Sequence, residues 1–327
     1  MLSFDSVKTA FAFDRYTQNW SYNLAEFRID FWPPPTPQGP IAFLTMARDE
    51  TFLMKAWIEN GLRISPAAEF FVLDHGSAPA LASTLSEFTD GRGVKINFMR
   101  IPPVPFDDDF KAMALTSFAK VLLQGYEIVV TTDCDELLVG LGLRDNEVLP
   151  TLQSLEGIAA PIGFEVVQHI SRENAFDPSA PIELQRAYGF FASGYTKPVI
   201  WKKRSEFSAG LHAVRDDFEY APTLGLLHLR SVDASISDSR AAQRREFELS
   251  PSQLQAGRGG HWHSPLEKKI NFFAKLNSLD TIPECQDLFP DFMGLLTGTH
   301  KKSGSGFYGH DISHQSGYCH IGDILYV

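Results

Sequence analysis

The stretch from Ile41 to Thr132 alternates short apolar runs with segments whose apolar residues recur at helical spacing. Apolar runs bounded by turn residues are typical of buried parallel strands, and the helical spacing predicts helices between them. The strand-like runs lie at 41–46, 69–73, 94–101 and 127–132, and the helical segments lie at 52–61, 81–88 and 115–122. This alternation predicts an α/β domain with a mostly parallel sheet flanked by helices on both sides.

The pattern divides the chain into three predicted parts. Residues 1–40 are aromatic and irregular and end in a proline run, which predicts an N-terminal extension with a stiff lead-in. The α/β domain extends over 41–235, with further strands expected at 158–170 and 199–203. Residues 236–327 are expected to form a C-terminal helical or irregular extension, in which Ser264 and Glu267 form a capping box at the start of a helix that runs to about Leu276.

Net charge and cysteine content narrow the class of protein. The formal charge of −11 disfavours binding to a nucleic-acid backbone and non-specific attraction to anionic lipid, although it leaves peripheral membrane contact open. No apolar run reaches the roughly 18 residues of a membrane span, and the N-terminus lacks the pattern of a secretory signal. Cys134, Cys285 and Cys319 are odd in number and widely spaced, so we expect reduced thiols in the cytoplasm.

Two aspartates directly follow the fourth predicted strand, in the segment Asp133-Cys134-Asp135-Glu136. The carboxyl ends of parallel strands meet at one edge of the sheet, where α/β proteins bind ligands. Carboxylates held close together raise each other's pKa unless a cation lies between them. Oxygen ligands favour Mg²⁺ or Mn²⁺, so the pair predicts a metal site that also holds a diphosphate. An acidic turn after a strand is the alternative.

Three segments in this order resemble the family-2-like glycosyltransferases, which have a Rossmann-like GT-A fold. They are residues 45–50 (TMARDE), residues 71–77 (FVLDHGS) and residues 133–136 (DCDE). The match is good over 41–140 and looser to about residue 235. It implies a metal-dependent transferase, using Mn²⁺ or Mg²⁺, that moves a sugar from a nucleotide-sugar donor, with UDP as the expected nucleotide. The implied acceptor is a glycan or other hydroxyl compound, such as a surface polysaccharide or lipid-linked glycan.

The resemblance also implies roles for matched residues. Asp74 and the first-strand end from Thr45 to Arg48 would line the nucleoside pocket. Asp133 would contact the ribose or donor sugar and ligate the metal with Asp135, while Glu136 would orient the pair. Arg48-Asp49 stands where Lys-Asn is usual, and His75 stands where Asn or Asp is usual, so the base preference is not implied. Asp74 before Gly-Ser also suits a structural turn.

Further candidates come from the second half of the chain. His228 is the preferred third metal ligand, and His212 is either an alternate ligand or a donor-phosphate contact; both are equally explained as packed core histidines. Lys197 resembles a lysine found near the donor, and Lys111 and Arg100 are other candidates for phosphate binding. Each of these three is otherwise a solvated surface charge.

The catalytic base has no clear spacing signature. Glu165 and Asp217 are the candidates, with Asp216 and Glu183 behind them, and an enzyme that retains configuration needs no dedicated base. The segment His261-Trp262-His263 is interpreted as a plain loop, a lid whose tryptophan stacks on a sugar, or a second metal site.

Other classes of protein fit less well. A catalytically inactive GT-A-fold protein that binds nucleotide or sugar is the main alternative, although paired charges are costly to keep in an idle site. A sugar nucleotidyltransferase needs a glycine-rich loop after the first strand, where this chain has Ala47-Arg48-Asp49-Glu50. Glycoside hydrolases use two carboxylates, but normally on separate strands.

Overall fold

The structure is a computed structural model that describes residues 11–14, 19–22, 39–101, 105–258, 266–310 and 314–325. Its strands are β1 (Phe11–Asp14), β2 (Asn19–Tyr22), β3 (Ile41–Ala47), β4 (Glu69–Asp74), β5 (Ile96–Arg100), β6 (Ile128–Thr131), β7 (Glu136–Gly140), β8 (Ile158–Val167), β9 (Tyr188–Phe191), β10 (Ile200–Trp201), β11 (Glu219–Ser231), β12 (His300–Lys302), β13 (Tyr308–His310) and β14 (Cys319–His320). Its helices are α2 (Phe52–Ile64), α3 (Pro79–Arg92), α4 (Asp108–Leu122), α5 (Asp145–Ser154), α6 (Ala234–Arg245), α7 (Pro251–Gln255), α8 (Leu266–Asn277), α9 (Cys285–Thr299) and α10 (Gly322–Leu325), with short 3-10 turns η1 (Ile182–Leu184), η2 (Ser193–Tyr195) and η3 (Ala209–Leu211).

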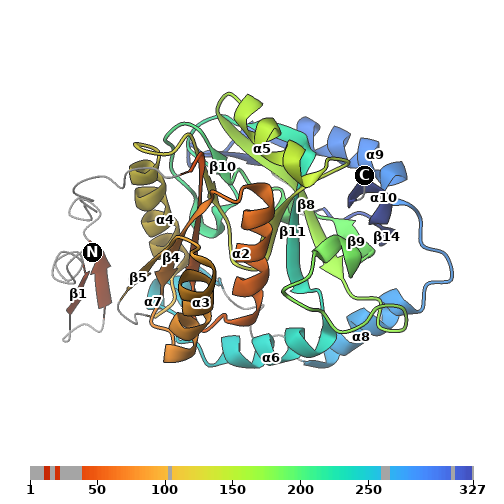
Figure 1. Cartoon of the computed structure of the whole chain (residues 1–327), viewed down its shortest axis with the longest axis horizontal. Helices are drawn as coiled ribbons and strands as arrows, with labels where there is room; N and C mark the ends of the chain where they lie inside the picture. Colours follow the sequence, from red (N-terminus) through yellow and green to blue (C-terminus); the bar gives the residue numbers. More distant parts are fainter. Residues whose placement is uncertain are drawn as a thin grey trace.

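A ten-stranded mixed sheet forms the centre of the molecule (Figure 1). Its main order is β14-β9-β8-β10-β6-β3-β4-β5, and β11 pairs with both β8 and β7. Strands β4, β5 and β6 run parallel to β3, whereas β10 is antiparallel to its neighbours β6 and β8. Since β8 and β11 again run in the direction of β3, most of the sheet has one direction. The predicted α/β architecture is therefore confirmed.

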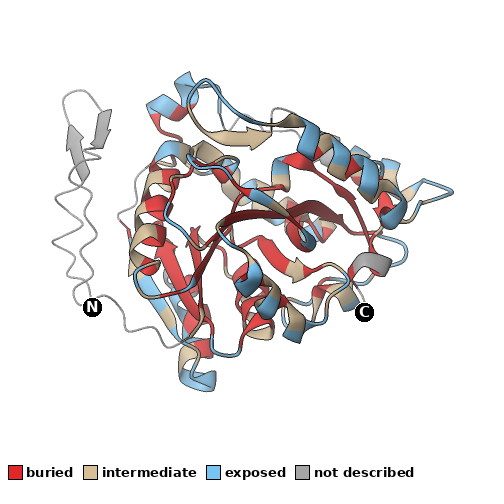
Figure 2. Cartoon of the chain, turned by 90° about the horizontal axis from the view of Figure 1, so that it is seen from above, coloured by how far each residue is buried: buried red, intermediate tan, exposed pale blue. Residues whose placement is uncertain are grey.

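Helices cover both faces of this sheet. Side chains of successive strand residues point to opposite faces, so a buried strand presents apolar side chains to the helices on each side. Ile41 and Phe43 of β3 pack with the apolar sides of α2 and α3, whereas Ala42 and Leu44 pack against α4 on the other face. The strands are buried while the outer surfaces of the helices are exposed, as Figure 2 shows. The two cores fix the strand ends relative to each other, which is what a binding site at the sheet edge needs.

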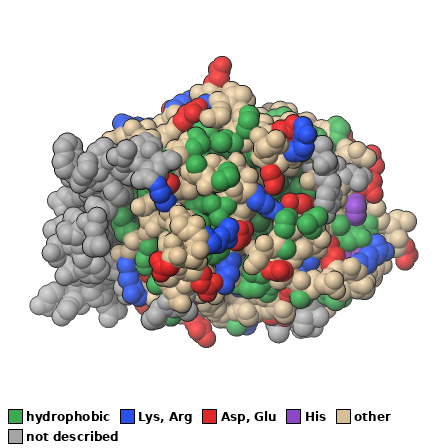
Figure 3. Space-filling model, in the orientation of Figure 1, with side chains coloured by type: hydrophobic (Ala, Val, Ile, Leu, Met, Phe, Trp, Pro, Cys, Tyr) green, Lys and Arg blue, Asp and Glu red, His purple; other side chains and the backbone are tan. Residues whose placement is uncertain are grey.

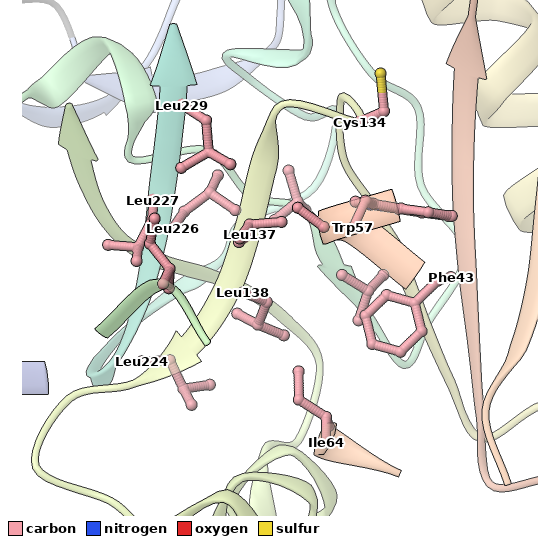
Figure 4. Packing of buried hydrophobic residues seen from close by; sticks show 14 of the residues in the cluster. Phe43, Trp57, Ile64, Cys134, Leu137, Leu138, Leu224, Leu226, Leu227 and Leu229 are labelled. Carbon is pink, nitrogen blue, oxygen red and sulfur yellow. The ribbon is translucent and has the colours of Figure 1, made fainter. Parts of the chain in front are cut away.

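Strands β7 and β11 extend the apolar core on the α2 side of the sheet beyond the parallel strands β3, β4, β5 and β6. Figure 4 shows Leu137 and Leu138 of β7 between the leucines of β11 and Trp57 of α2. The Trp57 indole also donates a hydrogen bond of 2.9 Å to Thr132 Oγ1, directly before the two aspartates. Helix α2 thereby supports the segment on which Asp133 and Asp135 lie.

The strand order reverses beside β3. The chain places β4 and β5 on one side of β3 and then returns to place β6 on the other side. In open α/β sheets, ligands bind outside the carboxyl ends of the strands at such a reversal. Here those ends are Ala47 of β3 and Thr131 of β6, so the fold predicts a ligand between Arg48 and Asp133.

The region beyond residue 235 also contributes to the central sheet and its surroundings. Helix α6 begins directly after β11 and lies along the lower edge of the sheet in Figure 1. Strand β14 pairs with β9, and α8 is present where the capping box predicted a helix. The capping residue Ser264 and the segment 261–263 lie outside the described residues. None of the helices in the described part of the chain has the length and apolar character needed to span a bilayer.

The cysteine expectation is wrong for two of the three residues. Cys285, at the start of α9, and Cys319, in β14, form a disulfide. Cys134 is a free, buried thiol. Sequence spacing did not reveal the pair because 34 residues separate the two cysteines, and they meet only when α9 and β14 pack at the edge of the sheet.

Asp107 ties helix α4 to the segment that follows α6, and replacing it should destabilise the protein. Its carboxylate caps α4 through Asp109 N (2.9 Å) and Phe110 N (3.0 Å) and also accepts hydrogen bonds from Ser250 and Ser252. Asp107→Ala should lower the free energy of unfolding by about 2–3 kcal/mol. Urea denaturation measures this loss. Asp109→Ala is the matched control, because its exposed pair with Arg258 contributes less than about 1 kcal/mol.

The stabilisation that the Asp107 carboxylate contributes should depend on pH. Burial alone would raise the pKa of Asp107, but the serine hydroxyls and the backbone N–H groups of α4 lower it below the usual value. A lowered folded-state pKa means that the stabilisation is complete above the unfolded pKa and is lost as pH falls through the folded pKa. The difference between wild type and Asp107→Ala should therefore shrink in acid. A difference that stays constant down to low pH would contradict this assignment.

Candidate active site

A cavity of about 310 Å³ lies at the carboxyl edge of the sheet, at the point where the strand order reverses. Its wall combines residues from β3, β11, α4, α6 and the turn between β6 and β7. The charged residues of the wall are Arg48, Glu50, Asp108, Lys111, Asp133, Asp135, Lys197, Arg230, Arg240 and Arg244. On the molecular face that Figure 3 shows, Lys and Arg side chains likewise lie beside Asp and Glu. The cavity is therefore rich in cations although the whole chain is acidic.

Strand register brings three titratable residues into one row. His228 of β11 lies opposite Glu136 of β7 on one side and Glu165 of β8 on the other. The His228 ring Nδ1 is 2.7 Å from Glu165 Oε2, and its Nε2 is 3.8 Å from Asp135 Oδ2. Tyr195 stacks on the imidazole with ring centroids 4.0 Å apart. Burial would lower the pKa of His228, but the surrounding carboxylates raise it above its usual value.

Asp133 lies between two lysines. Lys111 of α4 contacts one carboxylate oxygen, and Lys197 Nζ is 3.8 Å from the other. Lys197 also binds Glu136 Oε1 at 2.5 Å, and Glu136 Oε2 accepts a hydrogen bond of 3.2 Å from Asp133 N. Burial would raise the pKa of Asp133, but Lys111 and Lys197 hold it below its usual value. Glu136 thus binds both the backbone N–H of Asp133 and the ammonium group of Lys197.

Asp135 is held by an arginine from a distant part of the chain. Arg240 Nη2 of α6 is 2.8 Å from Asp135 Oδ2, and Arg240 Nε is 2.5 Å from Glu50 Oε2. Burial would raise the pKa of Asp135, but Arg240 and His228 lower it well below its usual value. Both carboxylates are therefore ionised and already paired with side-chain cations.

The side chains around Asp135 meet only part of what the predicted divalent metal would need. Ligands of one ion at about 2.0–2.2 Å lie about 3–4 Å apart, so Asp135 Oδ2 and His228 Nε2 could share one. The Glu165 contact to the other ring nitrogen is also typical of a metal-binding histidine. However, among the described residues no three His, Cys, Asp or Glu side chains are arranged to hold an ion. Because Arg240, Lys111 and Lys197 occupy the carboxylates, this arrangement does not fit a bound divalent metal.

Several residues predicted for the site line the cavity. Arg48, Lys111, Asp133, Asp135, Lys197, His212 and His228 all do so. Arg48 lies over the ring of Phe247 at 4.7 Å, at the expected end of β3. Desolvation by the surrounding protein and the positive charge of Lys197 lower the pKa of His212, which lines the cavity.

Other predicted residues lie elsewhere. Thr45 is fully buried inside β3, and buried Asp74 accepts a hydrogen bond of 2.8 Å from Ser77 N, as in the structural turn considered above. Glu165 contacts His228 instead of lining the cavity. Asp217 lies before the opposite end of β11, with its side chain 65% exposed and bound to His300 at 2.7 Å. Glu183 pairs with Arg63 at 3.0 Å.

Sequence reasoning missed the residues of α6. Arg240, Gln243 and Arg244 all line the cavity, and Gln243 Nε2 donates to Asp49 O at 3.2 Å. Their segment is polar, and Arg240 is 190 residues from its partner Glu50. No local spacing signature marks such a contact. The one available signal was the placement of α6 directly after the strand that carries His228.

No protein-family model matches the sequence, and no curated protein sequence matches it. Among solved structures, the chain is similar to a mannosyltransferase from Pyrobaculum calidifontis in complex with GDP-Man and Mn²⁺, with 16% identity, 42% of this chain and 38% of that chain covered, and a TM-score of 0.29. It is similar to the galactosyltransferase LgtC with donor and acceptor sugar analogues, with 19% identity, 37% and 46% covered, and a TM-score of 0.27.

A third similar structure is a fragment of TarS from S. aureus in complex with UDP-GlcNAc, with 9% identity, 66% of this chain and 69% of that chain covered, and a TM-score of 0.36. The matched part spans less than half of the mannosyltransferase and galactosyltransferase chains. Two of these proteins are sugar transferases and the third binds a nucleotide sugar.

Proposed function

We propose that this chain is a GT-A-type glycosyltransferase that moves a sugar from a nucleoside diphosphate sugar to a hydroxyl acceptor. The observation that carries the proposal is the pairing of Asp133 with Lys111 and Lys197 inside a cavity at the reversal of strand order. A diphosphate needs clustered cations, and the sugar and ribose hydroxyls need an ionised carboxylate. This cavity presents both at the position where α/β sheets bind nucleotides.

We assign different parts of the donor and the acceptor to different sides of the cavity. Arg48, at the end of β3, faces the nucleoside, and Lys111 and Lys197 contact the diphosphate. Asp133 binds the ribose or the donor sugar. The acceptor lies toward β11 and η2, where Arg230 and Tyr195 line the wall.

The reaction has simple bond changes. The bond between sugar C1 and the β-phosphate oxygen breaks, a bond from C1 to the acceptor oxygen forms, and the proton of the acceptor hydroxyl passes to solvent or to the leaving diphosphate. Negative charge grows on the leaving diphosphate, and cations already in place stabilise that charge without reorganisation. Neither Glu165 nor Asp217 is assigned the proton transfer, because Glu165 binds His228 and Asp217 lies outside the cavity.

The proposal also covers the nucleotide and the acceptor, but not the metal or the cellular location. UDP is the proposed nucleotide and a glycan or lipid-linked glycan the proposed acceptor, on the sequence resemblance alone. The divalent metal that the sequence resemblance implies is left out of the proposal, because Arg240, Lys111 and Lys197 already pair with Asp135 and Asp133. The Cys285–Cys319 disulfide opposes the cytoplasmic location expected from the sequence, because disulfides are rare in that compartment.

Calorimetric titration tests the function. UDP, GDP and CDP are each titrated into the purified protein, with Mn²⁺ and with EDTA, and the matching nucleotide sugars are then assayed for release of nucleoside diphosphate in the presence of hydroxyl acceptors. We expect one nucleotide to bind and its sugar donor to be turned over. No binding of any nucleotide in either condition would refute the proposal, and binding without turnover would favour an inactive binding protein.

Replacing Lys111 should weaken nucleotide binding without unfolding the protein. A hydrogen bond to a charged group contributes about 1.5–3 kcal/mol, so Lys111→Met should raise the Kd of the nucleotide by roughly 10- to 150-fold. Lys120→Met is the matched control, since Lys120 lies on the same helix but pairs with Glu206 at the surface. Calorimetry on both variants measures the effect. Equal losses in the two variants would show that Lys111 does not contact the nucleotide.

A further inference from the structure

Arg240 binds two carboxylates at once in the floor of the cavity. Its Nε lies 2.5 Å from Glu50 Oε2 and its Nη2 lies 2.8 Å from Asp135 Oδ2, and the side chain is only 12% exposed. Within the described residues, its remaining nitrogen Nη1 is buried without a hydrogen-bond partner. The guanidinium therefore supplies a full positive charge at the oxygen that a metal would need.

Helix α6 holds this arginine firmly in position. At its start, Asp233 caps the helix through Ser235 N (3.0 Å) and also accepts a hydrogen bond of 3.0 Å from Phe176 N. Beyond Arg240, Gln243 donates to the backbone of Asp49, so both ends of the helix are fastened to the sheet edge. Arg240 is thus part of the packed structure and not a surface side chain that happens to reach the cavity.

The positive charge extends one turn along the same helix. Arg244 lies four residues after Arg240, on the same helix face, and lines the cavity with it. Burial lowers the pKa of Arg244, and the nearby charges of Arg240 and Arg230 lower it further. Such a cluster of cations is stabilised when an anion, such as a diphosphate, lies between them.

A divalent ion and this guanidinium compete for one place. An ion on Asp135 Oδ2 would repel Arg240, and moving Arg240 away would also leave Glu50 buried without its cation. At Asp133, Lys111 and Lys197 present the same conflict. A charged partner would have to move before a metal could bind at Asp135 Oδ2 or at either oxygen of Asp133.

We propose that Arg240 takes the place of a divalent metal at Asp135, so that this protein binds its nucleotide without a divalent cation. The proposal rests on the proposed function for the identity of the ligand, a nucleoside diphosphate. Arg240 acts as a positioning residue that neutralises Asp135 and Glu50, while Lys111, Lys197 and Arg244 face the phosphates.

Direct measurement of Mn²⁺ binding tests this without any nucleotide. The electron paramagnetic resonance signal of free Mn²⁺ is followed as wild type, Arg240→Ala and Arg245→Ala are added. Arg245 is the matched control, because it lies on the same helix and its Nε donates only to the backbone oxygen of Ala241 among the described residues. We expect wild type and Arg245→Ala to leave the signal unchanged, and Arg240→Ala to bind the ion through the freed carboxylates. Tight Mn²⁺ binding by wild type would overturn the proposal.

Nucleotide titration adds a second readout. In EDTA, wild type should bind the nucleotide as well as in Mn²⁺, whereas Arg240→Ala should bind it at least tenfold more weakly and recover in Mn²⁺. Arg240→Lys should keep binding in EDTA, because it keeps the charge. If the nucleotide affinity of wild type falls at least tenfold in EDTA, the proposal is overturned, while the transferase function stays intact. If no nucleotide binds any variant, the proposed function fails, and the Mn²⁺ experiment still decides the role of Arg240.

Discussion

Asp135→Asn should reduce turnover of the sugar donor by about 10²- to 10³-fold, the loss that follows when one preorganised charged contact is removed from an active site. The substitution keeps the shape of the side chain but removes its charge. Arg240 and His228, at 2.8 and 3.8 Å from Asp135 Oδ2, would then lose the carboxylate that positions them. Release of nucleoside diphosphate under saturating donor measures the effect.

The control for this prediction is Asp217→Asn. Asp217 was also a sequence candidate for catalysis, but its exposed side chain binds His300 away from the cavity. We expect wild-type turnover in that variant. Equal turnover in Asp135→Asn and wild type would remove Asp135 from the catalytic site, and a large loss in Asp217→Asn would restore it as a candidate base.

Arg186→Met should lower the free energy of unfolding by about 3–5 kcal/mol, because it leaves buried carboxylates without their cation. Arg186 is 1% exposed and lies 3.7 Å from Asp233 and 4.0 Å from Glu173. Its Nη1 also donates to Gln185 O at 2.7 Å. Since Asp233 caps α6, the substitution should weaken the attachment of that helix as well.

Urea denaturation followed by tryptophan fluorescence measures this loss. Arg172→Met is the matched control, since Arg172 is an exposed arginine that donates to Tyr188 Oη at 3.0 Å. An exposed pair of this kind should contribute less than about 1 kcal/mol. If the two variants are equally stable, the buried charge cluster around Arg186 does not hold this part of the fold together.

The sequence predicted the first half of the fold well because local pattern controls it. The strand Ile41–Ala47 and the helix Phe52–Ile64 lie where apolar runs and helical spacing placed them. Asp133 and Asp135 also lie at the sheet edge as expected, since that follows from strand direction alone. These features depend on residues close together in the chain.

The features that the sequence did not predict depend on contacts between residues far apart in the chain. Arg240 meets Glu50 across 190 residues, and Cys285 meets Cys319 only after α9 packs beside β14. Neither contact leaves a spacing pattern. Asp74 shows the converse, because its position at a strand end was predicted correctly while its side chain binds a neighbouring backbone N–H.

The two ends of the main strand order are protected from pairing with other molecules in different ways. Strand β5 ends the sheet on one side, and its partly exposed surface carries Asn97 and Arg100, which discourage another strand from adding there. Strand β9 is apolar, and residues 315–320 cover its backbone through β14 and the Phe191–Ser316 hydrogen bonds. Because the Cys285–Cys319 bond fastens that cover, the C-terminal segment protects the folded protein from edge-to-edge aggregation.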